Sequence, residues 1–166
     1  MNDEDNRKDR DDAMHVAELN IGKLRHPPDD PRMAEFIGNL GRINAVAERS
    51  PGFVWRLQGE GEGAIDIFHP DHPDVNVNLS VWETAEDLEN YVFNTVHVKF
   101  YRRKPDWFEM PAEPSFVMWP VPIGHQPSVI EAWDRLEHLR AHGSSDYAFG
   151  WEALPHLKEW MEKRCA

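Results

Sequence analysis

Apolar and polar residues alternate along two segments of the chain, residues 14–24 and 75–83. Successive side chains of a β-strand point to opposite faces of a sheet, so this alternation predicts two strands, each with one apolar and one polar face. Two more strands are predicted over residues 53–58 and 115–121, which lie between connections that contain Gly and Pro.

Three helices are predicted between and after these strands. The first covers residues 31–49, where apolar residues recur at intervals of three and four. The second covers residues 84–104, with Thr84 as its N-cap and Pro105 as its end. The third covers residues 128–143, beginning with a capping box and ending at a glycine.

The order of these elements, β-α-β-β-α-β followed by a further helix, predicts an α+β fold of the ferredoxin-like, split βαβ type. Such a fold has a four-stranded antiparallel sheet with helices on one face, and its other face must be covered or wet. A chain of 166 residues suits one domain. We expect a disordered charged tail over residues 1–13, the ferredoxin-like domain over 14–152 and a helical C-terminal tail over 153–166.

The charge balance narrows the class of partner. There are 18 Lys and Arg against 30 Asp and Glu, a net charge of −12. This argues against nucleic acid or an anionic membrane surface, because both attract concentrated positive charge. No apolar run approaches the roughly 20 residues of a membrane span. The single cysteine, Cys165, permits no internal disulfide, which fits a reducing compartment. We therefore expect a cytoplasmic protein.

The predicted helix over residues 84–104 carries apolar residues on two opposite sides. One side is expected to pack on the sheet. The other, with Phe93, His97, Phe100 and Tyr101, must meet the C-terminal tail, a partner subunit or a ligand. His97 is interpreted as a general acid or base, or as an axial haem ligand. The alternative is a packed histidine satisfied by a carbonyl or a carboxylate.

Three consecutive cations, Arg102, Arg103 and Lys104, end the same predicted helix. They fit a clamp for an anionic substrate. They equally fit cations that complement the negative end of the helix dipole. The turn that follows is expected to bring Trp107 and Phe108 back toward the helix.

Alternating positions of the strands are polar and are expected to share one face of the sheet. These residues are Glu18, Asn20, Arg56, Gln58, Asn76, Asn78 and Ser80. A polar face that also contains Trp82 is interpreted as a pocket wall or a wet dimer interface. Arg56 is interpreted as a group that orients a substrate carbonyl or phenolate, and the alternative is a structural ion pair with Glu18 or Glu83.

Metal and nucleotide motifs are weak or missing. Residues 69–72 hold two histidines and an aspartate, but in a loop flanked by Gly and Pro. His138 and His142 have the i,i+4 spacing of a zinc motif without its glutamate. The sequence contains no GxGxxG, Walker A, GxSxG or CxxC pattern. We predict no metal site.

A set of motifs, in order along residues 14–152, resembles the family known as domain of unknown function 3291. The motifs are Glu18-Leu-Asn20, Gly52 to Arg56, Asn78 to Trp82, His97 with Trp107 and Phe108, Trp119 with Pro122, Gly124, His125 and Pro127, Glu131 with Arg135, and Ala148 with Phe149. The chain departs from the family pattern in having Pro120 after Trp119, and Ser144 and Ser145 after Gly143. Both departures are expected beside the cavity.

This resemblance implies a relationship to the dimeric α/β-barrel superfamily, in which two ferredoxin-like subunits pack sheet against sheet. The superfamily includes cofactor-independent monooxygenases, polyketide cyclases, muconolactone isomerase and haem-degrading enzymes, so the fold does not select one reaction. In the haem-degrading branch, a helix histidine ligates iron, and His97 is the comparable residue here.

We interpret the chain as a homodimeric small-molecule enzyme without a cofactor: a monooxygenase, cyclase or isomerase acting on an aromatic or polyketide-like substrate. The expected catalytic residues are His97 and Arg56. The expected substrate-binding residues are Trp55, Asn78, Trp82, Phe93, Tyr101, Trp107, Trp119, His125 and Phe149. One alternative is haem binding through His97. Another is a non-catalytic dimeric binding or accessory protein, which predicts a filled core around His97 with its ring nitrogens paired to the backbone.

Overall fold

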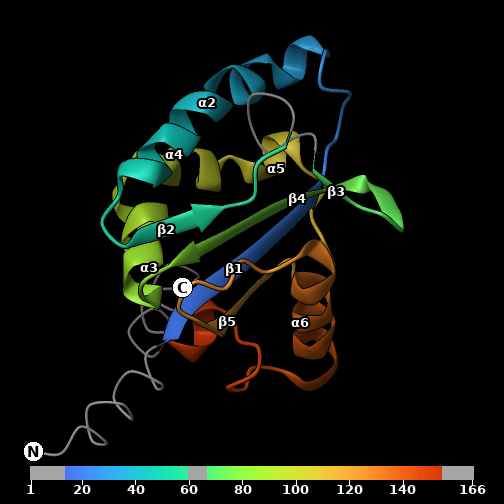
Figure 1. Cartoon of the computed structure of the whole chain (residues 1–166). Helices are drawn as coiled ribbons and strands as arrows, with labels where there is room; N and C mark the ends of the chain where they lie inside the picture. The colour runs from blue at the N-terminus through green and yellow to red at the C-terminus, as the bar shows by residue number, and fades with distance from the viewer. Residues whose placement is uncertain (1–13, 60–66, 155–166) are drawn as a thin grey trace, which may run out of the picture.

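The computed structural model describes residues 14–59 and 67–154 (Figure 1). The predicted tail over residues 1–13 lies outside the described residues, as does nearly all of the predicted C-terminal tail. Within the described part of the chain, no helix is long and apolar enough to cross a membrane.

The sheet has the predicted strands in a ferredoxin-like order. The strands are β1 (Met14–Lys23), β2 (Phe53–Arg56), β3 (Phe68–His69), β4 (His72–Trp82) and β5 (Phe116–Pro122). The order is β2-β4-β1-β5 and every pairing is antiparallel, while β3 adds a short ribbon to β4. This order confirms the α+β, split βαβ prediction. The third predicted strand begins earlier than expected, and the second ends two residues sooner.

The helices flank this sheet. They are the 3₁₀ turn η1 (Pro31–Met33), α2 (Ala34–Arg49), α3 (Ala85–Asn94), α4 (His97–Arg102), α5 (Lys104–Trp107), α6 (Val129–His142) and the 3₁₀ turn η3 (Trp151–Ala153). Thr84 and Ser128 cap α3 and α6 as predicted, because each hydroxyl accepts a bond from the backbone N–H three residues later.

The prediction of one helix over residues 84–104 is wrong, because the chain breaks at Thr95. Thr95 has extended backbone angles, with φ −118° and ψ −176°. Its hydroxyl donates to the Tyr91 carbonyl at 2.6 Å and accepts from the His97 N–H at 3.2 Å. Thr95 therefore ends α3 and starts α4 in a new direction. Pro105 ends no helix: it lies in the first turn of α5, where proline is tolerated.

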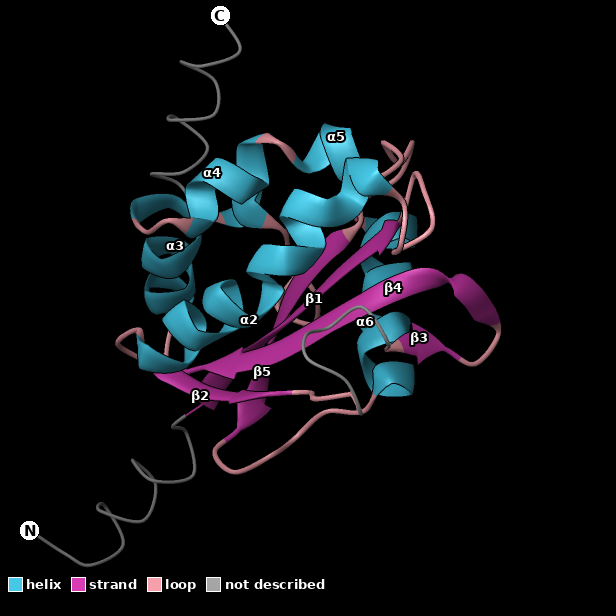
Figure 2. Cartoon of the chain, turned by 90° about the horizontal axis from the view of Figure 1, so that it is seen from above, coloured by secondary structure: helices cyan, strands magenta, loops and turns pink. Residues whose placement is uncertain are grey.

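Helices cover both faces of the sheet, as Figures 1 and 2 show. The alternation of β1 is confirmed, since Ala17 and Leu19 face α6 while Glu18 and Asn20 face the other way. Helix α6 covers the apolar face with Ala132, Leu136 and Leu139, which are all buried. The polar face lies under α2, α3, α4 and α5. Packing of two subunits sheet against sheet stays a prediction.

The segment after α6 returns to the edge of the sheet. The backbones of Phe149 and Met118 exchange two hydrogen bonds, of 2.7 and 2.9 Å. Just beyond, Trp151 stacks on Phe116 with ring centroids 4.7 Å apart and meets the edge of Phe93 at 5.4 Å. Of the predicted second apolar side, Phe93 is therefore covered by Trp151, which precedes the predicted C-terminal tail, whereas the other three residues of that side belong to α4.

Candidate active site

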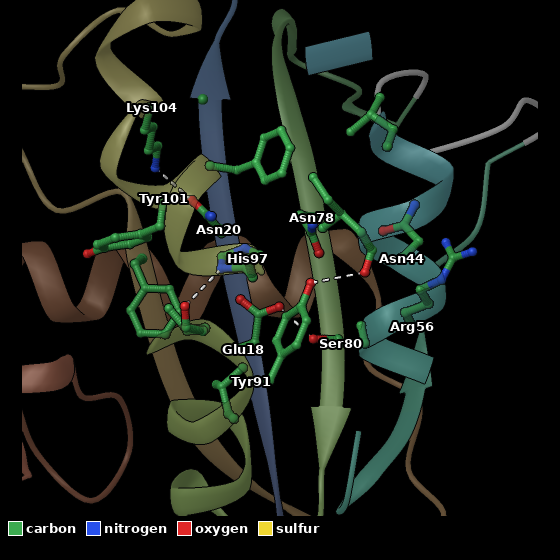
Figure 3. A pocket seen from close by; sticks show the side chains of 18 of the residues that line it. Glu18, Asn20, Asn44, Arg56, Asn78, Ser80, Tyr91, His97, Tyr101 and Lys104 are labelled. Carbon is green, nitrogen blue, oxygen red and sulfur yellow. Dashed lines mark hydrogen bonds between the residues drawn. The ribbon is translucent and has the colours of Figure 1, made fainter. Parts of the chain in front are cut away.

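A cavity of about 140 Å³ lies between the polar face of the sheet and helices α2 to α5. Its polar wall comes from strands β1 and β4, through Glu18, Asn20, Asn78 and Ser80. Its apolar wall comes mainly from the helices and the turn after α5, and includes Phe36, Tyr91, Phe100, Tyr101, Trp107 and Phe108. Figure 3 shows these walls facing one another across one space. The alternation seen in the sequence thus places the strand polar residues in a pocket wall.

Glu18 is the buried acid of this wall. It stands opposite Ser80 in the β1–β4 register, and its Oε1 accepts a hydrogen bond of 2.6 Å from the Ser80 hydroxyl. The side chain is 6% exposed. Burial raises the pKa of Glu18 to about 7, against the opposing effects of Ser80 and of the nearby Lys104 cation. A carboxyl group that titrates near neutrality suits proton transfer.

His97 faces the same cavity from the first turn of α4. Burial lowers the pKa of His97 to about 4, a shift opposed by the Val92 carbonyl and assisted by the Lys104 cation. The imidazole is therefore neutral at pH 7. Its Nδ1 lies 3.3 Å from the Val92 carbonyl oxygen, which can only accept, so Nδ1 carries the proton. Nε2 is then left as a proton acceptor.

Lys104 is the cation of the cavity. Its Nζ donates to Asn20 Oδ1 at 3.0 Å. Burial lowers the pKa of Lys104, and the charge of Glu18 opposes that shift. The two preceding cations lie elsewhere. Arg103 pairs with Glu35 at 2.6 Å and with Asp106 at 2.9 Å, and Arg102 is exposed.

Arg56 also lines the cavity, but it pairs with neither of the two carboxylates that the sequence suggested. Its Nε donates to Glu48 Oε1 at 2.7 Å, whereas Glu18 and Glu83 were the expected partners. Glu48 lies on α2, so the ion pair ties β2 to that helix. The Arg56 charge is therefore largely balanced at the edge of the cavity.

Six of the predicted site residues line this cavity, and the structure thus brings together a majority of the set. They are Arg56, Asn78, Trp82, His97, Tyr101 and Trp107. Asn78 is exposed to the cavity rather than packed. The ring of Trp82 stacks on Tyr91, another lining residue, with centroids 5.2 Å apart.

Five predicted residues do not line it. Trp55 and Trp119 lie on the apolar face, where Trp119 Nε1 donates to Glu131 Oε1 at 3.3 Å. His125 is exposed, and its Nε2 lies 2.7 Å from the other Glu131 oxygen. The two remaining residues, Phe93 and Phe149, pack around the C-terminal segment.

The two departures from the family pattern also lie away from the cavity wall. Pro120 belongs to β5 and pairs with Val16, and Gly143 ends α6. None of Pro120, Ser144 and Ser145 lines the cavity, so the expectation that both departures lie beside it is wrong.

Three residues that matter for the chemistry were not assigned to the site from the sequence: Glu18, Ser80 and Lys104. Alternation placed Glu18 and Ser80 on the polar face, but nothing in a single sequence indicates that a helix layer covers that face and desolvates the carboxyl group. Lys104 was indistinguishable from its neighbouring cations, because the two breaks at Thr95 and Arg103 together determine which of them faces inward.

The residues fit haem poorly. His97 Nε2 suits an axial ligand, and the bond of Nδ1 to a carbonyl is the usual support for one. The cavity, however, is smaller than the roughly 300–1,000 Å³ of pockets for drug-sized ligands, and a haem macrocycle is larger than such ligands. Among residues 14–59 and 67–154, no three His, Cys, Asp or Glu side chains are grouped to hold a metal ion.

The architecture is that of a ferredoxin-like α+β protein with a cavity lined in part by buried ionisable side chains. The chain belongs to the family described as Domain of unknown function (DUF3291), whose model matches residues 15–165. No curated protein matches the chain.

Two solved structures are similar to the chain in fold. One is SnoaB, a cofactor-independent oxygenase from Streptomyces nogalater, at 16% identity and a TM-score of 0.46, over 70% of this chain and 98% of that chain. The other is NE2512, a protein of unknown function from Nitrosomonas europaea, at 10% identity and a TM-score of 0.45, over 70% of this chain and 97% of that chain. Both likenesses are too distant to carry an argument about function.

Proposed function

We propose that this protein is a small-molecule enzyme that moves protons to and from a small aromatic substrate, with Glu18 and His97 as its acid and base. The observation that carries the proposal is the burial of the Glu18 carboxyl group in the wall of a partly aromatic cavity, which raises its pKa to about 7. Buried carboxyl groups with raised pKa values recur in general acid–base catalysis.

In this cavity the pKa of Glu18 lies above that of His97, the reverse of the usual order for a glutamate and a histidine. Because the pKa of Glu18 is about 7 and that of His97 is about 4, Glu18 holds a proton between these values while His97 does not. A carboxylic acid can then donate a proton while an imidazole accepts one. Pairs whose surroundings move their pKa values apart are typical of acid–base sites.

The cavity favours a substrate of one or two rings. The wall formed by the helices is largely aromatic, the volume is small, and Asn78 on the opposite wall offers both a donor and an acceptor to a substrate. Removal of a proton from a phenol, or from a carbon next to a carbonyl, gives an electron-rich anion. That anion is the reactive species of a cofactor-independent monooxygenase, a cyclase and an isomerase alike. The homodimer, the cytoplasmic location and the absence of a cofactor remain predictions.

The first step can be measured without knowledge of the natural reaction. In D₂O, 2-tetralone exchanges the acidic hydrogens next to its carbonyl, and NMR follows their loss. We expect the wild-type protein to accelerate this exchange and Glu18→Gln to remove a factor of roughly 10²–10⁴. His97→Gln should also slow it, whereas Glu137→Gln, on the exposed side of α6, is the matched control. Binding of 2-tetralone without accelerated exchange would instead identify a binding protein.

A further inference from the structure

Of the three consecutive cations at the end of α4, Lys104 is the one that enters the cavity. Arg103 lies outside, between two carboxylates and over the ring of Trp107, with its guanidinium carbon 4.7 Å from the ring centroid. Arg102 is exposed and does not line the cavity. Figure 3 shows Lys104 above Asn20, at one end of the row of polar side chains. The turn at Arg103, where α4 ends and α5 begins, directs the Lys104 side chain inward.

The Lys104 ammonium group has more N–H donors than its one hydrogen bond uses. Lys104 Nζ carries three N–H groups, and the hydrogen bond of 3.0 Å to Asn20 Oδ1 uses one of them. Within the described residues, no carboxylate forms an ion pair with it. The nearest acid in electrostatic terms is Glu18, which accepts a hydrogen bond from Ser80 and whose pKa is raised by burial to about 7. A partly buried cation with free donors is a binding site for an anionic oxygen.

We propose that the ligand of this cavity carries an anionic oxygen on an aromatic ring, a carboxylate or a phenolate, and that Lys104 binds that oxygen. This inference rests on the same cavity as the proposed function and names the class of its substrate. The ring lies among the aromatic side chains of α4 and α5, and its charged end reaches Lys104 beside Asn20 and Asn78.

Anion binding is then coupled to the protonation of Glu18. The titratable and charged groups that line the cavity with Lys104 are Glu18 on β1, His97 and Tyr101 on α4, Tyr91 on α3 and Arg56 on β2. His97, Tyr91 and Tyr101 are neutral near pH 7, and Arg56 is paired with Glu48. When Glu18 takes up a proton, Lys104 is left as the unbalanced charge of the cavity. An aromatic anion should therefore bind more tightly as the pH falls through the Glu18 titration.

Calorimetric titration of benzoate and of benzamide, its neutral counterpart, tests whether the site binds a carboxylate. Titration of 4-nitrophenol and of 4-nitroanisole, at a pH above the pKa of free 4-nitrophenol, tests whether the site binds a phenolate. We expect the wild-type protein to bind at least one anion roughly 10- to 100-fold more tightly than its neutral counterpart. Lys104→Gln should abolish that preference and Lys104→Arg should retain most of it. Lys99→Gln, an exposed lysine of α4, is the matched control.

Glu18→Gln reproduces the protonated carboxyl group. In this variant benzoate should bind as tightly at one pH unit above the wild-type Glu18 pKa as at one unit below it. The proposal is overturned if both neutral compounds bind as tightly as the anions, or if folded Lys104→Gln keeps the preference. The proposed function is tested separately: selective anion binding without 2-tetralone exchange removes the catalysis and leaves the anion site.

Discussion

Glu18 and Ser80 stand directly opposite each other on neighbouring antiparallel strands, and a hydrogen bond of 2.6 Å joins their side chains. Two residues farther along β4, the indole Nε1 of Trp82 donates to the same Ser80 oxygen at 2.9 Å. An indole N–H can only donate, so it occupies an acceptor position of the serine and directs the hydroxyl hydrogen toward the carboxyl group. This chain of donors favours the ionised form of Glu18 and leaves its second oxygen to carry the proton.

Removal of a donor from this chain should raise the pKa of Glu18. Ser80→Ala deletes the bond to the carboxylate, and a hydrogen bond to a charged group corresponds to a shift of roughly one to two pKa units. Trp82→Phe keeps an aromatic ring against Tyr91 but loses the N–H, so a smaller rise is expected. Titration of the Glu18 carboxyl carbon by NMR measures both. An unchanged midpoint in both variants would show that Trp82 and Ser80 only pack.

The stability of the fold should depend on pH through two opposing groups. The folded-state pKa of Glu18, about 7, exceeds its unfolded value of 4.5, so stability falls as the pH rises between these values. The folded-state pKa of His97, about 4, lies below its unfolded value of 6.5, so stability rises with pH in that window. Each effect is on the order of 3 kcal/mol, and the two largely cancel in the wild-type protein.

Single variants should uncover each effect. Relative to wild type, Glu18→Gln should gain stability as the pH rises from 4.5 to 7, and His97→Gln should lose it as the pH rises from 4 to 6.5. Urea unfolding at a series of pH values gives both difference curves. Parallel curves for all three proteins would mean that neither group is desolvated by folding.

The sequence predicted the two faces of the sheet well, because alternation is a local property of a strand. Glu18, Asn78 and Ser80 share one face as expected. The same rule also places Trp119 with Val117 on the opposite, apolar face. The misplacement of Trp119 thus came from treating a large ring as evidence of a pocket, although the alternation of its own strand indicated core.

The helix layer was harder to predict. Residues 84–104 contain no glycine, and Pro105 was the sole obvious breaker, so a helical wheel treats the segment as continuous. The break at Thr95 rests on side-chain bonds to Tyr91 and His97 that compete with the helix ladder. That competition is resolved by tertiary packing, so the direction in which Lys104 points was not readable from the sequence.

Gly22 should be required for closure of the cavity. It lies on β1 under the ring of Phe108, where an added Cβ would overlap the ring. Phe108 is held from the other side by Phe36, at a centroid distance of 5.2 Å. Gly22→Ala should therefore cost about 1–3 kcal/mol and displace the ring from the cavity wall. Thermal unfolding and benzamide titration report the two consequences.

Gly38 provides the control for this change. It lies within α2 with open space where an added Cβ would lie, so Gly38→Ala should stabilise the protein by about 0.5–1 kcal/mol and leave benzamide binding unchanged. If Gly22→Ala behaved like Gly38→Ala, the contact between Phe108 and β1 would not close the cavity.

Substitution of two buried tryptophans should distinguish effects on ligand binding from effects on stability. Trp107 lines the cavity and stacks between Phe36 and Phe100, at centroid distances of 5.3 and 5.9 Å. Trp119 is equally buried, but it lies on the apolar face under α6. Each Trp→Leu change should cost roughly 2–4 kcal/mol of stability, because both remove a large ring from a packed environment. In benzamide titrations of the folded proteins, only Trp107→Leu should weaken binding. Weaker binding in Trp119→Leu as well would show that the two faces of the sheet are coupled through β1 and β5.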